Sequence, residues 1–182
     1  LSLFLLDFGV VIFGFFRPLL PILAKDIFQV SATGLGILYA APAVGSVVGS
    51  STLLIIGDIQ RKGIVFLAAI FLYSLSLVGL GSATWFLVAL FAAGVLGFSD
   101  SLSVAVRQTL TQSLAPDRLR GRTASYSTVF ATLGNALGAM EAGFVAGLIG
   151  ASSTLMFGGG VAATIVLLGG LKWKHIWKFK TP

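Results

Sequence analysis

The chain has 182 residues, of which 57% are hydrophobic and only 10% are charged, and its formal net charge is +6. Soluble domains carry about 25% charged residues because their surface faces water, so this composition excludes a water-soluble globular protein. The absence of cysteine excludes disulfides and thiolate chemistry. The sequence therefore predicts a protein of the lipid bilayer.

Six segments are long and apolar enough to cross the hydrocarbon core, which takes roughly 20 residues of helix. In chain order they are about 1–24, 34–56, 63–81, 85–114, 122–148 and 153–171, before a basic and aromatic tail over 172–182. Strands of a membrane barrel would be short and alternating, whereas these runs are long and continuously apolar. We therefore expect an all-α membrane protein with six transmembrane helices, with kinks at Pro18, Pro21 and Pro42.

Basic residues mark one side of the predicted bundle. If six helices alternate, nine lysines and arginines fall on one side, and the other side has only Lys25. The nine follow the second, fourth and sixth segments: Arg61 and Lys62; Arg118, Arg120 and Arg122; Lys172, Lys174, Lys178 and Lys180. The positive-inside rule makes this side cytoplasmic. The sequence thus predicts a multi-pass protein of the cell (inner) membrane with a cytoplasmic carboxyl terminus.

The basic tail does not indicate a nucleic-acid partner. Its lysines alternate with Trp173, Trp177 and Phe179, an aromatic and basic pattern that anchors chains to interfacial lipid. The expected partner of this tail is the lipid bilayer, and no nucleic acid is expected.

Five ionisable residues fall inside the predicted spans, where a charge costs about 2.5–3.5 kcal/mol on insertion scales. They are Asp7, Arg17, Asp100, Arg107 and Glu141. Depth along the helices predicts two cross-helix pairs, Asp7 with Arg107 and Arg17 with Glu141, and leaves Asp100 near the middle without a cation at its level. We interpret these residues as candidates for a polar transport pathway. The alternatives are that the pairs only hold helices in register and that Arg107 extends to the headgroups.

Glycines recur four residues apart in the second and fifth segments, a spacing that lets two helices approach closely. The pairs are Gly45 and Gly49, Gly134 and Gly138, and Gly143 and Gly147. Ordinary helix packing is the favoured interpretation, and a mobile interface against a second half is the alternative. The matched glycine-rich segments and the count of three plus three spans predict an inverted repeat.

Residues 107–143 carry a resemblance to a known family. The stretch "RQTLTQSLAPDRLRGRTASYSTVF" and the following "NALGAMEAG" resemble the tenth and eleventh helices of major facilitator superfamily transporters. The similarity is greatest to the branch of enterobactin exporters and macrolide-efflux proteins, and "FRPLLPILAKDIFQVSATGLGILYAAPAVGS" resembles the seventh and eighth helices. The resemblance rests on these residues: Arg107, Gln108, Gln112, Pro116, Asp117, Arg120, Gly121, Arg122, Asn135, Gly138, Glu141 and Gly143.

The resemblance implies the carboxy-terminal six-helix half of a two-half transporter, with alternating access about a central cavity and often proton antiport. Family members carry a Gly-x-x-x-Asp-Arg-x-Gly-Arg-Arg loop, and "GDIQRKG" keeps Asp58, Arg61 and Lys62 of a degenerate copy, with Leu54 in place of the first glycine. By this resemblance Asp58 is a candidate latch. The cytoplasmic gate candidates are Asp58, Arg61, Asp117, Arg120 and Arg122, and the alternative is that these charges only set topology.

The predicted function is proton-coupled efflux of amphipathic small molecules, such as drugs or siderophores, by a secondary active transporter. Leu1 stands where a start methionine would, so we expect a fragment that works with a missing amino-terminal half or a second copy. Enzymatic activity is not expected, because His-Glu-x-x-His and nucleotide-binding motifs are missing and His175, the sole histidine, is in the tail. No cofactor or metal is expected. The alternative is a non-transporting six-span subunit that assembles with partner proteins.

Overall fold

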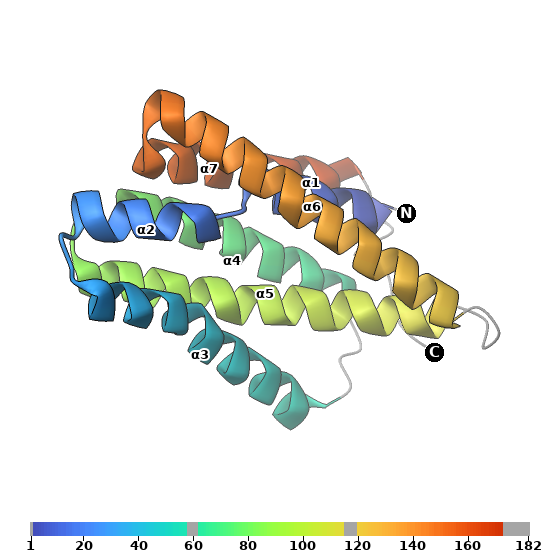
Figure 1. Ribbon diagram of the computed structural model, residues 1–182. Coiled ribbons are helices and arrows are strands. Elements are labelled where there is room, and N and C mark those ends of the chain that lie inside the picture. Colours follow the sequence, from blue (N-terminus) through green and yellow to red (C-terminus); the bar gives the residue numbers. More distant parts are fainter. Residues whose placement is uncertain (1, 58–61, 115–119, 173–182) are drawn as a thin grey trace.

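The computed structural model describes residues 2–57, 62–114 and 120–172 (Figure 1). At several helix ends within these ranges it describes the backbone alone, and this applies to Asp7, Lys62 and Arg120. Every regular element in the described ranges is helical, and six helical segments are long and apolar enough to cross a membrane. The prediction of an all-α protein with six spans is confirmed.

Five of the six spans are single helices, and the first is broken. The unbroken helices are α3 (Ala32–Ile56), α4 (Lys62–Ser82), α5 (Phe86–Leu114), α6 (Arg120–Ile149) and α7 (Ala151–Lys172). The first span consists of α1 (Ser2–Phe13), the 3₁₀ helix η1 (Arg17–Leu19), α2 (Leu20–Ile22) and the π-helix η2 (Leu23–Ile27).

The break lies just before the two prolines of the first span. Pro18 and Pro21 stand in the first turns of η1 and α2, where a missing N–H removes no helix hydrogen bond. Freed carbonyls in a membrane need new partners, and tyrosines of neighbouring helices supply them. The Tyr73 hydroxyl donates to the Gly14 carbonyl at 2.8 Å. Pro42, by contrast, lies inside α3, which continues through it.

The amino end of α1 and the carboxyl end of α7 lie at the same end of the bundle (Figure 1). Lys62 and Arg120 begin helices there and Lys172 ends one. Lys25 belongs to η2 at the opposite end. This arrangement follows from six alternating spans, and it gathers the basic helix ends on one membrane surface.

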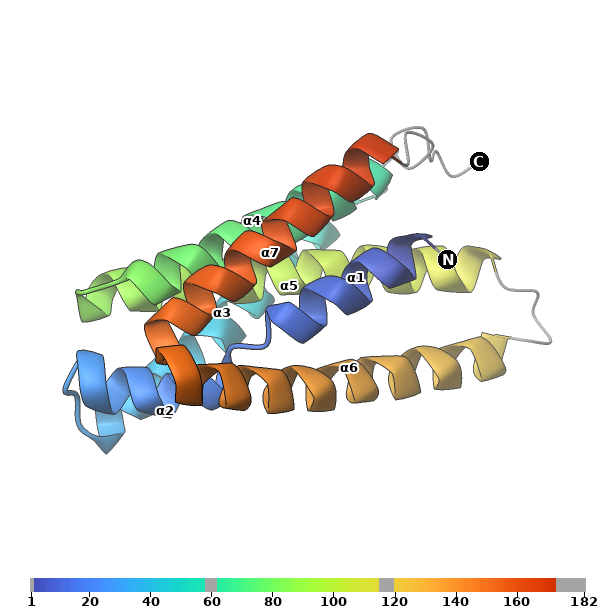
Figure 2. The ribbon, with the colours of Figure 1, turned by 90° about the horizontal axis from the view of Figure 1, so that it is seen from above.

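The packing of the spans has the symmetry of an inverted repeat. The main contacts join α3 to α5, α4 to both α5 and α7, and α1 to both α6 and α7 (Figures 1 and 2). Exchanging the first three spans with the last three converts the α3–α5 contact into α6–α1 and the α4–α5 contact into α7–α1. The α4–α7 contact maps onto itself. A 3+3 inverted repeat requires this correspondence, and the predicted architecture is confirmed.

The glycine pairs occupy two of these matched contacts. A methyl group at Gly45 or Gly49 of α3 would overlap the backbone of α5, at Gly94 and Phe98 respectively. A methyl group at Gly138 of α6 would meet the backbone of α1, 2.9 Å from the Val11 carbonyl oxygen. Ordinary helix packing, the favoured interpretation, is therefore confirmed for these positions. Nothing lies within 4 Å of the corresponding points at Gly143 and Gly147.

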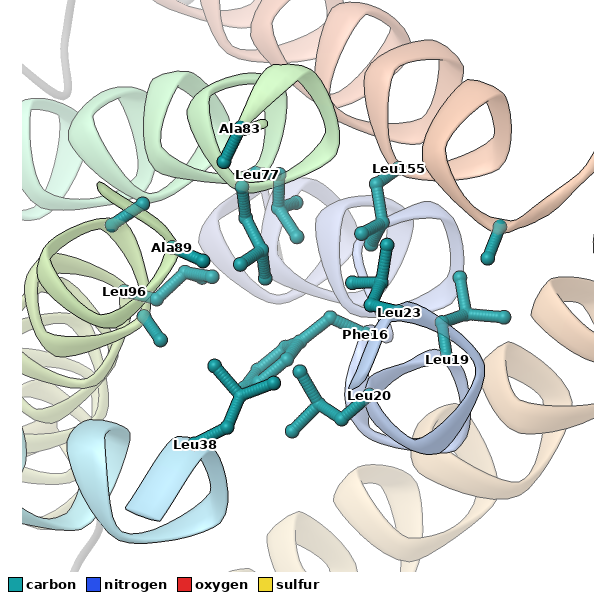
Figure 3. Packing of buried hydrophobic residues seen from close by; sticks show 14 of the residues in the cluster. Phe16, Leu19, Leu20, Leu23, Leu38, Leu77, Ala83, Ala89, Leu96 and Leu155 are labelled. Carbon is teal, nitrogen blue, oxygen red and sulfur yellow. The ribbon is translucent and has the colours of Figure 1, made fainter. Parts of the chain in front are cut away.

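The largest apolar core lies toward the Lys25 end of the bundle. Figure 3 shows Phe16, Leu20 and Leu23 of the first span packed against Leu38 of α3 and Leu77 of α4. The carboxyl end of α3, by contrast, is not packed into this core. It leans away from the other helices in Figure 1, and Leu54 and Ile55 are 84% and 85% exposed. A second, smaller apolar core joins α1, α4, α5 and α7 toward the basic end, and the carboxyl end of α3 takes no part in it.

Candidate functional site

The break in the first span opens into a polar cavity of about 390 Å³. Five of the six spans contribute to its wall, and α7 does not. The lining residues are Val11, Phe15, Phe16, Arg17, Leu20, Tyr39, Pro42, Ala43, Ser46, Tyr73, Leu96, Gly97, Asp100 and Asn135.

Arg17 and Asp100 bring opposite charges into this cavity. Both side chains are exposed. Arg17 directly follows the break in the first span, and Asp100 lies at the middle of α5. An exposed charge at that depth must face water or protein rather than lipid, because lipid contact is costly. The cavity is thus a charged chamber within the membrane-spanning part of the bundle.

This placement corrects two expectations. Asp100 does have a cation at its level, namely Arg17, and in the described part of the chain Arg17 forms no ion pair with Glu141. The physical reason is that the first span is broken between Phe13 and Arg17, so counting 1.5 Å per residue along a continuous helix misplaces Arg17. Counting residues along a helix also does not show in which direction a side chain points around the helix axis. Glu141 is half-buried on α6 and is not among the cavity residues.

Hydrogen bonds around the cavity hold the broken segment in place. Besides the bond from Tyr73 to Gly14, the Tyr39 hydroxyl donates to the Arg17 carbonyl at 3.3 Å. The Ser46 hydroxyl donates to the Gly97 carbonyl at 3.1 Å and joins α3 to α5. Sequence reasoning missed these polar residues. A usable signal was the presence of hydroxyl side chains inside apolar spans, since a break in one membrane helix needs donors from its neighbours.

Of the two remaining pathway candidates, Arg107 and Asp7, only Arg107 has a described side chain, and it is not among the cavity residues. Arg107 is half-buried on α5, two helical turns beyond Asp100 toward the basic end. Asp7 belongs to α1, but its side chain is outside the described residues, so its predicted pairing with Arg107 stays a prediction.

The structure describes only some of the residues predicted to form the cytoplasmic gate. Asp58, Arg61 and Asp117 lie outside the described residues. Arg120 begins α6 with only its backbone described, and Arg122, two residues further on, is exposed. Their gate roles stay predictions. Within the described ranges, no three histidine, cysteine or carboxylate side chains gather as they would around a metal ion.

Six membrane-length helices, five of which line a charged internal cavity at the break in the first span, define a transporter domain of the inverted-repeat class. Residues 1–174 match the sequence model of the Major Facilitator Superfamily. The chain belongs to this family, and the family points to a transporter rather than an enzyme.

The chain is also similar to curated exporters. It is 27% identical over 163 residues to the enterobactin exporter EntS of Escherichia coli K12, which covers 87% of this chain and 39% of the relative. The EntS protein of Shigella dysenteriae serotype 1 gives the same identity and coverage. That of Escherichia coli O81 is 30% identical over 124 residues, 68% of this chain and 29% of the relative. The chain thus spans about two fifths of the length of the relatives it matches.

Proposed function

We propose that this chain is the carboxy-terminal half of a secondary active transporter that exports amphipathic small molecules by alternating access. The observation that carries the proposal is the cavity, where Arg17 and Asp100 meet aromatic and apolar side chains at a break in a membrane helix. Such a wall suits a molecule with both polar and apolar parts. The names of the relatives support export. The relatives' remaining length suggests a second half, supplied by the rest of the protein or by another copy.

Asp100 is the proposed site of proton coupling. In the membrane interior the carboxylate and the Arg17 guanidinium balance each other's charge. A proton on Asp100 removes this balance and changes the net charge of the cavity by one. This change would favour a different arrangement of the two halves, which is the physical link that coupling requires.

The end of the bundle that holds Lys62, Arg120 and Lys172 is the proposed cytoplasmic end, in the inner membrane. The cavity would exchange substrate with the cytoplasm in one state of the alternating-access cycle.

Efflux from cells that carry the full-length gene tests this function. Drugs and a siderophore are loaded, and their loss is followed with the proton gradient intact and after it is collapsed. We expect export that stops when the gradient collapses. Export that continues at the same rate after the proton gradient is collapsed would contradict the proton coupling. No export of any compound, in cells where the protein reaches the membrane, would contradict the transport function.

A further inference from the structure

An apolar groove of about 480 Å³ lies between α3 and α5, and all of its lining residues are apolar or glycine. Its floor forms where the two helices approach at small residues, since a methyl group at Gly45 would overlap the Gly94 carbonyl. Larger side chains form its walls, among them Val44, Val48 and Phe91, which are 63%, 52% and 75% exposed. The groove is therefore open to the surroundings of the chain.

The groove and the polar cavity lie on opposite sides of these two helices. On α3 the groove is lined by Ile37, Ala40, Ala41, Val44, Gly45 and Val48, and the cavity by Tyr39, Pro42, Ala43 and Ser46. At about 100° per residue, the centres of these two sets lie about 180° apart around the axis of α3. The corresponding sets on α5 lie about 140° apart. A second half that shares the cavity would therefore leave the groove uncovered.

The length of the groove matches one leaflet of a bilayer. From Ile37 to Val48 it follows about 16 Å of α3, at about 1.5 Å per residue. One leaflet fills half of the hydrocarbon core, which is roughly 30 Å thick. Both α3 and α5 begin at the Lys25 end of the bundle (Figure 1), and on α5 the groove ends at Phe98, near the middle of that helix. The groove thus belongs to the leaflet at the Lys25 end.

We propose that this α3–α5 groove binds one acyl chain of a phospholipid from the leaflet at the Lys25 end. Lipid tails are as apolar as leucine, so a chain gains nothing from the hydrophobic effect when it moves from the bilayer into the groove. Binding depends on shape instead, because a chain in the groove contacts both walls and the floor, whereas a convex helix surface offers contacts on one side only. The proposed function enters only in placing the second half on the cavity side.

Photocrosslinking in the full-length transporter tests the site. A phospholipid with a diazirine midway along one acyl chain is added at increasing mole fraction to vesicles that hold the transporter, and labelled residues are identified by mass spectrometry. We expect labelling within 37–48 and 90–98 to saturate at low mole fraction, because a binding site fills. Phe157 of α7 is the reference, since it is 54% exposed and a similar number of residues from the start of its helix as Phe91. Its labelling should rise in proportion to the mole fraction.

A variant that fills the groove gives a second measurement. Val44→Trp places a large side chain in the groove, and Val47→Trp is the matched control, because Val47 is 66% exposed on the same helix and is not a groove residue. Native mass spectrometry of the purified full-length transporter counts the phospholipids that stay bound. We expect Val44→Trp to retain one phospholipid fewer than the wild type and Val47→Trp to retain the same number.

Three results would overturn the inference. Groove labelling that rises in proportion to the mole fraction, as at Phe157, would show ordinary lipid contact. Equal phospholipid counts in Val44→Trp and Val47→Trp would show that no chain is held there. An absence of lipid labelling in the groove would show that the second half or another copy of the protein covers it. None of these measurements depends on export, so the proposed function and the lipid site can fail separately.

Discussion

At the scale of single residues, Arg17 and Asp100 matter because each compensates the other's charge in a cavity within the membrane. Removing one charge leaves the other uncompensated at a depth where a lone charge costs about 2.5–3.5 kcal/mol. We expect Asp100→Asn and Arg17→Gln each to lower the thermal stability of the full transporter. The double variant should recover most of it, as measured by a thermal-unfolding assay on the purified protein.

The same residue carries a prediction about pH. Because the proposed coupling runs through protonation of Asp100, efflux by Asp100→Asn should no longer respond to pH, while the wild-type rate does. Asp26→Asn is the control, since Asp26 is an exposed carboxylate at the end of the first span and is not a cavity residue. A wild-type pH profile in Asp100→Asn would assign proton coupling to another group.

Tyr73 shows how one hydroxyl supports the broken helix. Tyr73→Phe removes the 2.8 Å bond to the Gly14 carbonyl and leaves that carbonyl without its donor. Hydrogen bonds between membrane helices contribute on average about 0.6 kcal/mol and at most about 1.7 kcal/mol, so we expect a loss of stability in this range. Tyr39→Phe should cost less, because its bond is longer, at 3.3 Å, and exposed. An unfolding measurement that ranks the two variants the other way would contradict this account.

At the scale of the elements, glycine decides how closely helices approach. Gly45→Leu places a side chain where the α5 backbone lies, and overpacking typically costs 1–3 kcal/mol. We expect it to reduce the yield of folded protein and its melting temperature. Gly143→Leu is the matched control on α6, since nothing lies within 4 Å of the added atom there. An equal loss of folded yield and melting temperature in both variants would show that the loss comes from helix propensity rather than from close packing.

At the scale of the whole molecule, the topology has a direct test. Ser31→Cys and Trp85→Cys lie in turns at the Lys25 end, and Arg122→Cys lies at the basic end. In intact cells an impermeant thiol reagent should label the first two positions. Arg122→Cys should react with the reagent only after the membrane is permeabilised. Labelling of all three from one side would contradict the alternation of the spans.

The spans themselves follow from local chemistry. A run of apolar residues of bilayer length, closed by a cluster of basic residues, forms a helix whatever its neighbours do, since every backbone group must be satisfied within the segment. For this reason the spans that became α3 to α7 could be predicted from the chain alone. The glycine pairs at Gly45 and Gly134 likewise predicted close helix contacts. The sequence could not show which helix each pair would meet.

The sequence by itself determined that this is an all-α membrane protein of six alternating spans, because hydropathy and charge act along the chain. Only the tertiary structure decided that Arg17 and Asp100 share one cavity and that Tyr73 supports the break before it. These pairings depend on the direction in which each side chain leaves its helix and on where a helix stops. Both are set by packing between segments far apart in the sequence.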